Sequence, residues 1–387
     1  MSKFKRVRSQ LSAAIMIAVL MGITTGCWDM VEPNERSIWV GSGVDSAAGR
    51  KIDLSVQIAV PRALGEGGGQ QKPYLVKSTV GRNLEDCFQR LQAQLSRQIF
   101  LGHRHAVFVG QKTAETGMRR LMDEFGRNPR SNIRAKLFLV KGATAKAFLA
   151  ESGGIEYFST EKAIRQTRFN GINDKMTTMI FFKEVLQRDG MRPLMQVVET
   201  GTEKDPKSEA EGSEPSHREI ALFNNSAAAV GYLQEEEAIA ALWAAGYLED
   251  QMVTETVYGQ EVTIDLHHMK RTLKSKIEGE NVELKLILRA QGIVDENDTD
   301  LNLFIYSDMK KVEQAFNQKI EQQMNTMIKM VQQKYKTDIF GFGEDIHRRH
   351  PKQWSQMKGN WDERFPKVKV TVISNIVIRH IGERGPK

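Results

Sequence analysis

The chain has 387 residues, of which 40% are hydrophobic, and its formal net charge is +7. This length exceeds that of a single typical core, so we expect two or three domains. Four of the positive charges lie among the first eight residues, at Lys3, Lys5, Arg6 and Arg8. The small charge left on the remaining body, without a basic stripe interleaved with aromatic residues, argues against nucleic acid as a partner.

The first 26 residues resemble a lipoprotein signal peptide. The basic start is followed by an apolar run from Leu11 to Ile23. Its length of roughly 13 residues suits the hydrophobic part of a signal peptide and is too short for a membrane-spanning helix. Small residues then lead to Cys27, although Thr24 stands where lipoprotein cleavage sites usually have leucine. We predict a signal peptide over 1–26 and lipidation of Cys27, with ordinary secretion and a free Cys27 thiol as the alternative.

Lipidation of Cys27 would tether the following body to a membrane surface without a spanning helix. Each buried CH₂ group contributes about 0.8 kcal/mol, and two or more acyl chains hold a protein firmly. The second cysteine of the chain, Cys87, then has no partner for an intramolecular disulfide. Cys87 lies in an apolar helical pattern, which predicts a small core residue rather than a reactive thiol.

Residues 27–199 alternate between strand-like and helix-like patterns. Strict alternation of apolar residues from Ile52 to Val60 predicts a strand, and helical spacing over about 81–98 predicts a helix. Thr113 is the predicted cap of the next helix. Further elements are strands over 37–45, 101–110, 133–140 and 194–199, a short helix that begins at Thr144, and a helical piece over 161–188. This order predicts an N-terminal α+β region of one or two subdomains.

A polar segment over residues 200–219 divides the chain. Acidic residues, Lys, Gly, Ser and Pro replace nearly all apolar residues there, so we predict a mobile linker or a long loop. Residues 220–387 are the predicted C-terminal α+β domain, and we expect each half to fold alone. Its predicted elements are strands over 220–223, 253–257, 261–266, 282–294 and 367–379, and helices over 235–245 and 308–336. The predicted class is α+β, with mostly antiparallel or mixed sheets packed with helices.

The longest of these helices, over 308–336, carries one continuous apolar stripe. Such a stripe favours a helix packed across a sheet, and a coiled-coil seam is the alternative.

The histidines are the places to look for metal or catalytic chemistry. His103 and His105 are two residues apart on a predicted strand, so both would face one side. His347 and His350 share a predicted helical face with Glu344, but this set lacks the spacing of a zinc-protease helix. A structural role is favoured for both pairs, and the adjacent His267 and His268 form a third. No nucleophile motif, phosphate-binding loop or paired-carboxylate motif is present, so we predict no catalytic, metal or cofactor residues and no enzymatic activity.

Three aromatic residues gather near the C-terminus, at Trp354, Trp361 and Phe365. Large aromatic side chains are enriched at protein interfaces, so they could form a binding surface. The alternative, which we favour, is a local core packed against the long predicted helix.

The C-terminal stretch resembles the signature of the Ger(x)C family, the lipoprotein C subunits of nutrient germinant receptors in endospore-forming bacteria. The residues that carry this resemblance are Asp338 to Glu344, His347, Pro351, Trp354, Asn360, Trp361, Phe365, Pro366 and the alternating strand that follows. Gly26 to Asp29 with Glu32, and Leu101 to His103, resemble blocks of the same family in the N-terminal half. The departures are Thr24 and the length and acidity of the 200–219 segment.

The resemblance implies an α+β protein held by its lipid on the outer face of the spore inner membrane. It also implies two partners, an A subunit with soluble and membrane parts and a B subunit similar to amino-acid transporters. Such a complex senses small nutrients and triggers germination. The family offers no enzymatic activity and no established ligand residues for this subunit, and direct nutrient binding is left open. The alternative function is a solute-binding lipoprotein that serves a transporter, which would need two similar lobes around a cleft.

Overall fold

The computed structural model describes residues 16, 32, 35–60, 72–128, 131–200, 218–279 and 281–381. Cys27, nearly all of the predicted signal peptide and residues 201–217 of the predicted linker lie outside this set, so these predictions stay predictions. Within the described residues, no helix has both the length and the apolar character needed to cross a membrane.

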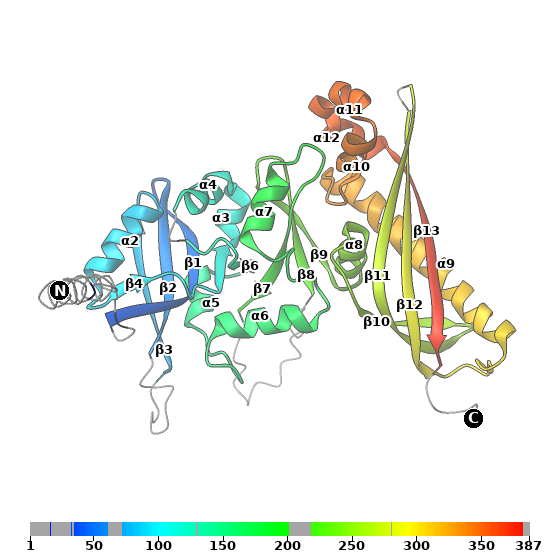
Figure 1. Cartoon of the computed structure of the whole chain (residues 1–387), viewed down its shortest axis with the longest axis horizontal. Coiled ribbons are helices and arrows are strands. Elements are labelled where there is room, and N and C mark those ends of the chain that lie inside the picture. Colours follow the sequence, from blue (N-terminus) through cyan, green and yellow to red (C-terminus); the bar gives the residue numbers. More distant parts are fainter. Residues whose placement is uncertain are drawn as a thin grey trace, which may run out of the picture.

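Two mixed sheets lie side by side along the longest axis of the molecule, with a helix between them (Figure 1). The first has nine strands and the second has four. The predicted α+β class, with helices packed on each sheet, is confirmed.

The nine-stranded sheet has the order β3-β2-β1-β5-β6-β7-β8-β9, and β4 pairs with β1. Its centre, from β1 through β7, is parallel, and the pairs on either side are antiparallel. The strands are β1 (Arg36–Ala47), β2 (Lys51–Ala59), β3 (Tyr74–Gly81), β4 (Gln98–Phe100), β5 (Ala106–Gly110), β6 (Lys136–Lys141), β7 (Leu194–Glu199), β8 (Glu219–Phe223) and β9 (Ala229–Gln234).

The helices of this region are α2 (Leu84–Ala93), α3 (Gln111–Thr116), α4 (Arg119–Arg127), α5 (Ala145–Ala150), α6 (Ser159–Phe169) and α7 (Met179–Leu186). They cover both faces of the sheet. On β5, Val107 and Val109 belong to the core that contains residues of α2, α4 and α7, whereas Phe108 packs with residues of α5 and α6. Central parallel strands that are covered on both faces consist almost entirely of apolar residues.

Two helix predictions are wrong in detail. The helix expected after Thr113 is interrupted at Gly117, whose φ of +105° favours glycine, and Thr113 lies inside α3 rather than at its cap. The helical piece over 161–188 is likewise two helices, separated by a turn in which Gly171 has a φ of +67°. The predicted cap Thr144 is confirmed, because its hydroxyl accepts a hydrogen bond from the Ala147 backbone N–H at 3.1 Å.

The four-stranded sheet has the order β10-β11-β12-β13, and only its β12–β13 pair is parallel. Its strands are β10 (Gln251–Val257), β11 (Gln260–Glu278), β12 (Asn281–Asn297) and β13 (Lys369–His380). The helix α8 (Glu235–Ala245) lies between the two sheets, and α9 (Tyr306–Met330) crosses the second sheet and ends in the π-helical turn η3 (Val331–Tyr335) (Figure 1). The prediction of a long helix packed across a sheet is confirmed.

The helix α9 also protects the outer edge of the second sheet. Unpaired backbone groups of an edge strand can recruit other chains, and a covering helix prevents this. Here side chains four residues apart on α9 reach the backbone of β13. Ile378 N–H donates to Glu313 Oε1 at 2.9 Å, Ile376 N–H to Asn317 Oδ1 at 2.8 Å and Ser374 N–H to Glu321 Oε1 at 2.8 Å.

The two sheets do not separate at the polar segment. Residues 220–234, which we expected at the start of the C-terminal domain, belong with Glu219 to β8, β9 and the turn between them in the first sheet. The side chains of β8 alternate between two cores: Ala221 and Phe223 pack with the first sheet, while Ile220 and Leu222 join the large core that contains α8, α9 and the second sheet. The sheets therefore divide after Gln234.

Candidate functional site: the junction between the two sheets

The stretch that follows α9 folds into a connection between the sheets. Lys336, with a φ of +53°, ends the helical segment, and residues 337–341 then lead into α10 (Phe342–Arg349). After it come α11 (Pro351–Met357), η4 (Lys358–Asn360), α12 (Trp361–Arg364) and η5 (Phe365–Lys367). Thr337 Oγ1 donates to the carbonyl oxygen of Phe223 on β8 at 2.8 Å. The C-terminal connection thus contacts the first sheet directly.

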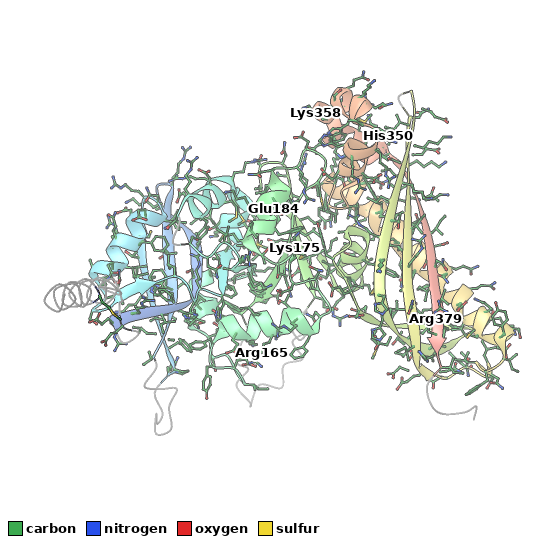
Figure 2. All side chains as sticks on the ribbon, viewed as in Figure 1. Arg165, Lys175, Glu184, His350, Lys358 and Arg379 are labelled. Carbon is green, nitrogen blue, oxygen red and sulfur yellow. The ribbon has the colours of Figure 1, made fainter. Side chains whose placement is uncertain are left out.

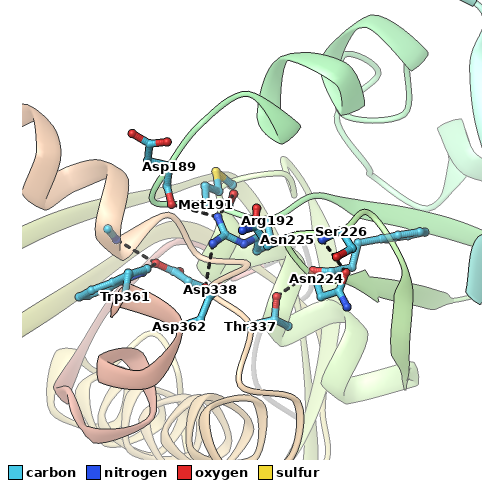
Figure 3. A network of polar contacts seen from close by, with 12 residues as sticks. Asp189, Met191, Arg192, Asn224, Asn225, Ser226, Thr337, Asp338, Trp361 and Asp362 are labelled. Carbon is cyan, nitrogen blue, oxygen red and sulfur yellow. Dashed lines mark hydrogen bonds and ion pairs between the residues drawn. The ribbon is translucent and has the colours of Figure 1, made fainter. Parts of the chain in front are cut away.

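Asp338 organises this connection. Its carboxylate, which is almost fully buried, accepts five hydrogen bonds, and the one from Trp361 is drawn in Figure 3. Four come from the backbone N–H groups of Phe340, Gly341, Phe342 and Gly343, at 2.8 to 3.2 Å, and the fifth comes from Trp361 Nε1 at 3.0 Å. Phe342 and Gly343 are the first residues of α10, where N–H groups have no partner within the helix, and the other two donors directly precede it. One carboxylate therefore fixes both the entry of α10 and the position of Trp361.

Burial raises the pKa of the Asp338 carboxyl above its ordinary value, while the hydrogen bonds from Gly343, Phe342 and Trp361 act in the opposite direction because they favour the charged form.

Arg192, just before β7, joins the first region to this connection. Its backbone N–H donates to the carbonyl oxygen of Asp338 at 2.8 Å, and its Nη2 lies 2.8 Å from Asp362 Oδ1 (Figure 3). Nη1 donates to the carbonyl oxygens of Asp189 and Met191, both at 3.0 Å. The guanidinium is thus held by main-chain oxygens of its own loop and by a carboxylate from α12.

The two regions also touch backbone to backbone at a pair of glycines. The N–H of Glu344 donates to the carbonyl oxygen of Gly190 at 3.1 Å. A Cβ atom on Gly190 would lie 2.2 Å from the carbonyl carbon of Gly343, a distance that real Cβ atoms do not adopt. Glycine is required here because only a missing side chain lets the two backbones approach so closely.

A second arginine, which is partly buried, connects the other side of the junction. Arg271 on β11 donates from Nη1 to the carbonyl oxygen of Ala244 at 2.6 Å, near the end of α8, and to the carbonyl oxygen of Phe340. Burial lowers the pKa of this guanidinium, which nevertheless stays charged at neutral pH. Nearby, the buried Asp345 accepts hydrogen bonds from Ser275, Arg348 and Arg349 at 2.9 to 3.0 Å.

The histidine pairs take structural positions. His103 and His105 lie in the turn before β5 rather than on the strand, and their ring centroids are 6.4 Å apart. Their expected placement on a strand is therefore wrong. Burial, followed by the nearby charge of His103, lowers the pKa of His105. His267 lies between two carboxylates, with Nδ1 3.0 Å from Asp250 and Nε2 3.0 Å from Asp265.

The set of Glu344, His347 and His350 does not share one helical face, because α10 ends at Arg349. The Nε2 atom of His350 lies 3.3 Å from the carbonyl oxygen of Ser275, beside the long hairpin of β11 and β12 (Figure 2). His347 instead stacks on Trp354, with ring centroids 6.0 Å apart. Within the residues that the structure describes, no group of three or more His, Cys, Asp and Glu side chains could hold a metal ion.

The aromatic cluster is core rather than surface. Trp354, Trp361 and Phe365 are all buried and belong to the same large core as α9. Cys87 is likewise buried, and burial together with the nearby charge of Asp86 raises its pKa to about 11. Both predictions of a core role are confirmed.

Sequence reasoning missed the two arginines of the junction. A single arginine outside any motif carries no local signal, so Arg192 and Arg271 could not be singled out. The role of Asp338 could have been predicted from the sequence, because an aspartate just before a glycine-rich helix start often accepts hydrogen bonds from free N–H groups.

Comparisons with known proteins agree across both regions. A family model described as "Spore germination protein N-terminal domain" matches residues 29–200, and one described as "Spore germination B3/ GerAC like, C-terminal" matches residues 218–382. Spore germination protein KC of Bacillus subtilis (strain 168) is 22% identical over 98% of this chain and 97% of its own length. Spore germination protein B3 of the same organism is 22% identical over 91% of this chain and 92% of its own length.

A solved structure has the same fold. The crystal structure of the GerBC protein covers 90% of this chain and 99% of its own length, with a TM-score of 0.55 and 17% sequence identity. Because the two family models together span nearly all of the chain after residue 28, and full-length relatives match both halves, the chain belongs to the non-enzymatic GerAC/Ger(x)C family of spore germination proteins, the C subunits of germinant receptors.

Proposed function

We propose that this protein is a lipid-anchored subunit of a nutrient germinant receptor, held through Cys27 on the outer face of the spore inner membrane. It is needed for receptor assembly and for the response of dormant spores to small nutrients. The observation that carries the proposal is the family match over both halves of the chain. The basic start, the short apolar run and the small residues before Cys27 support the lipid anchor.

The partners in this proposal are the A and B membrane subunits of the receptor, and the subunit acts through protein contacts. One surface suited to such contacts lies between β12 and α9, where three consecutive large side chains, Phe304, Ile305 and Tyr306, are 58%, 49% and 69% exposed. Exposed aromatic residues next to one another are typical of interaction surfaces.

The alternative of a solute-binding lipoprotein fits less well. That class needs two similar lobes around a cleft, whereas the two sheets here differ in strand number and in strand order. This difference between the two sheets favours the receptor-subunit proposal over the solute-binding alternative.

Intact mass spectrometry of the protein extracted from spore membranes tests the anchor. We expect a mature chain that begins at an acylated Cys27, and we expect the Cys27→Ala precursor to remain uncleaved at this site and unlabelled by lipid. A free Cys27 thiol in the wild-type protein would contradict the proposal. Spores that lack the protein should lose the response to one nutrient class and still germinate with a trigger that bypasses receptors.

A further inference from the structure

A cleft of about 710 Å³ opens beside the junction, between the end of α7, the end of α8, β11 and α10. Its size is typical of clefts that bind small molecules, and such clefts often lie where two parts of a fold meet. The cleft is formed by both regions of the molecule, because α7 belongs to the first sheet and β11 to the second.

The charges around the cleft are unbalanced. Five cationic side chains and two carboxylates line it, and the carboxylate of Asp345 is already paired with Arg348 and Arg349. The other basic groups are Arg188, Lys270 and Arg271. Across the described part of the chain, no carboxylate lies within salt-bridge distance of any of these three. A partly buried guanidinium without a counter-ion favours the approach of an anion.

The phenol of Tyr247 lines the same cleft as Arg188 and Arg271. The charges of Arg271 and Arg188 both act on the hydroxyl of Tyr247, although burial dominates and raises its pKa to about 12. The hydroxyl donates only to the sulfur of Met191, at 3.8 Å, as far as the described residues show. Sulfur is a weak acceptor, so this donor is free to serve a better one.

The wall beside these donors is apolar. Phe181 and Tyr247 meet edge to face, with ring centroids 5.4 Å apart, and the buried side chains of Met191 and Met269 complete the wall. Two guanidinium groups and one hydroxyl on an apolar wall match a small organic acid: its oxyanion would meet the three donors, and its hydrocarbon part would lie against the aromatic rings.

We propose that this cleft binds a small oxyanion through Arg188, Tyr247 and Arg271. The favoured ligand is an organic carboxylate with an apolar part, and inorganic phosphate is the other source of the same chemistry. Because Arg188 follows α7 and Arg271 lies on β11, a bound anion would connect the two regions and raise the melting temperature of the folded state.

Arg271 also supports the fold through its bonds to Ala244 and Phe340. The test therefore relies on Arg188→Gln and Tyr247→Phe, which remove a ligand donor without removing a bond to a buried carbonyl. Arg134, which is exposed and does not line the cleft, supplies the matched control Arg134→Gln.

The experiment is calorimetric titration and thermal melting of the full-length protein in detergent, at constant ionic strength, with benzoate, acetate and inorganic phosphate as probes. We expect saturable binding, with benzoate tighter than acetate because its ring buries apolar surface. Arg188→Gln should weaken benzoate binding about tenfold and Tyr247→Phe about threefold or more, while Arg134→Gln should leave it unchanged. Tight binding of phosphate with none of benzoate would assign the site to phosphate.

Three results would overturn the proposal. The first is no saturable binding of any probe to the folded wild-type protein. The second is binding that Arg188→Gln leaves unchanged, or that Arg134→Gln weakens equally. The third, tested by adding a short acidic peptide as a further ligand, is binding of that peptide with none of the three small anions, which would show that the cleft receives a carboxylate from a partner protein.

Discussion

The two sheets bury their strands in different ways. Every residue of β5 is buried in the first sheet, because helices cover both faces. In the second sheet β12 alternates between exposed and buried residues along most of its 17 positions, so one face meets solvent. The first sheet is stabilised from both sides, whereas the second depends on α9 and on the junction around Asp338. Contacts between residues that are far apart in the sequence therefore contribute most to stability in the C-terminal region.

Removal of β8 should have the largest effect on the stability of the first region. A fragment over residues 28–199 lacks β8 and β9, which leaves β7 without its antiparallel neighbour and removes Phe223 from the first core. We expect this fragment to lose its cooperative thermal transition and a fragment over 28–234 to retain one. Circular dichroism melts measure both. Equally cooperative melts would show that the first region ends before the polar segment, as the sequence pattern alone predicts.

Among single substitutions, Asp338→Ala should have the largest effect on stability. It leaves four backbone N–H groups and Trp361 Nε1 buried without an acceptor. We expect the free energy of unfolding to fall by on the order of 4 kcal/mol, measured by urea denaturation of the full-length protein. Asp123→Asn, which alters an exposed pair with Arg127, is the control and should cost less than about 1 kcal/mol. Equal losses would refute a special role for Asp338.

The edge of the second sheet that α9 covers provides a further test, at strand β13. Asn317→Ala removes the acceptor for the backbone N–H of Ile376 and the donor to its carbonyl oxygen. We expect a loss of about 1–2 kcal/mol in the free energy of unfolding and more aggregation on heating. The exposed neighbour Gln318 supplies the control Gln318→Ala, for which a change within about 0.5 kcal/mol is expected. Light scattering during the melt would detect the aggregation.

The smallest expected effect is on the pH dependence of stability, through His105 in the first region. The folded pKa of His105 lies below its ordinary value, first because of burial and then because of His103. At a pH between the folded and the unfolded pKa, the unfolded chain binds more protons. The contribution of His105 to the free energy of unfolding is therefore fully present above the unfolded pKa, near 6.5. It is lost as the pH falls through the folded pKa. In His105→Gln the stability should fall less steeply below about pH 6.5, which denaturation at several pH values would measure. An unchanged slope would contradict this.

The sequence predicts local elements well and long-range partners poorly. The bounds of α8 follow from its own apolar pattern and its glycine end at Gly246, and those of β7 follow from a run that is apolar apart from Gln196 and Glu199. No local pattern shows that β8 pairs with β7 across the polar segment and β9 with β8, or that Arg192 and Arg271 meet the loop around Asp338. These contacts depend on chain segments that only the folded structure brings together.

Co-isolation from spore membranes tests the central claim most directly. A tagged copy of this protein, solubilised with mild detergent, should carry the A and B receptor subunits with it. Cys27→Ala should reduce their yield because the subunit is no longer held at the membrane. Abundance of the tagged protein must be measured in the same spores, since loss of folding is the competing cause. Wild-type protein at normal abundance that brings down neither membrane subunit would contradict its assignment as a receptor subunit.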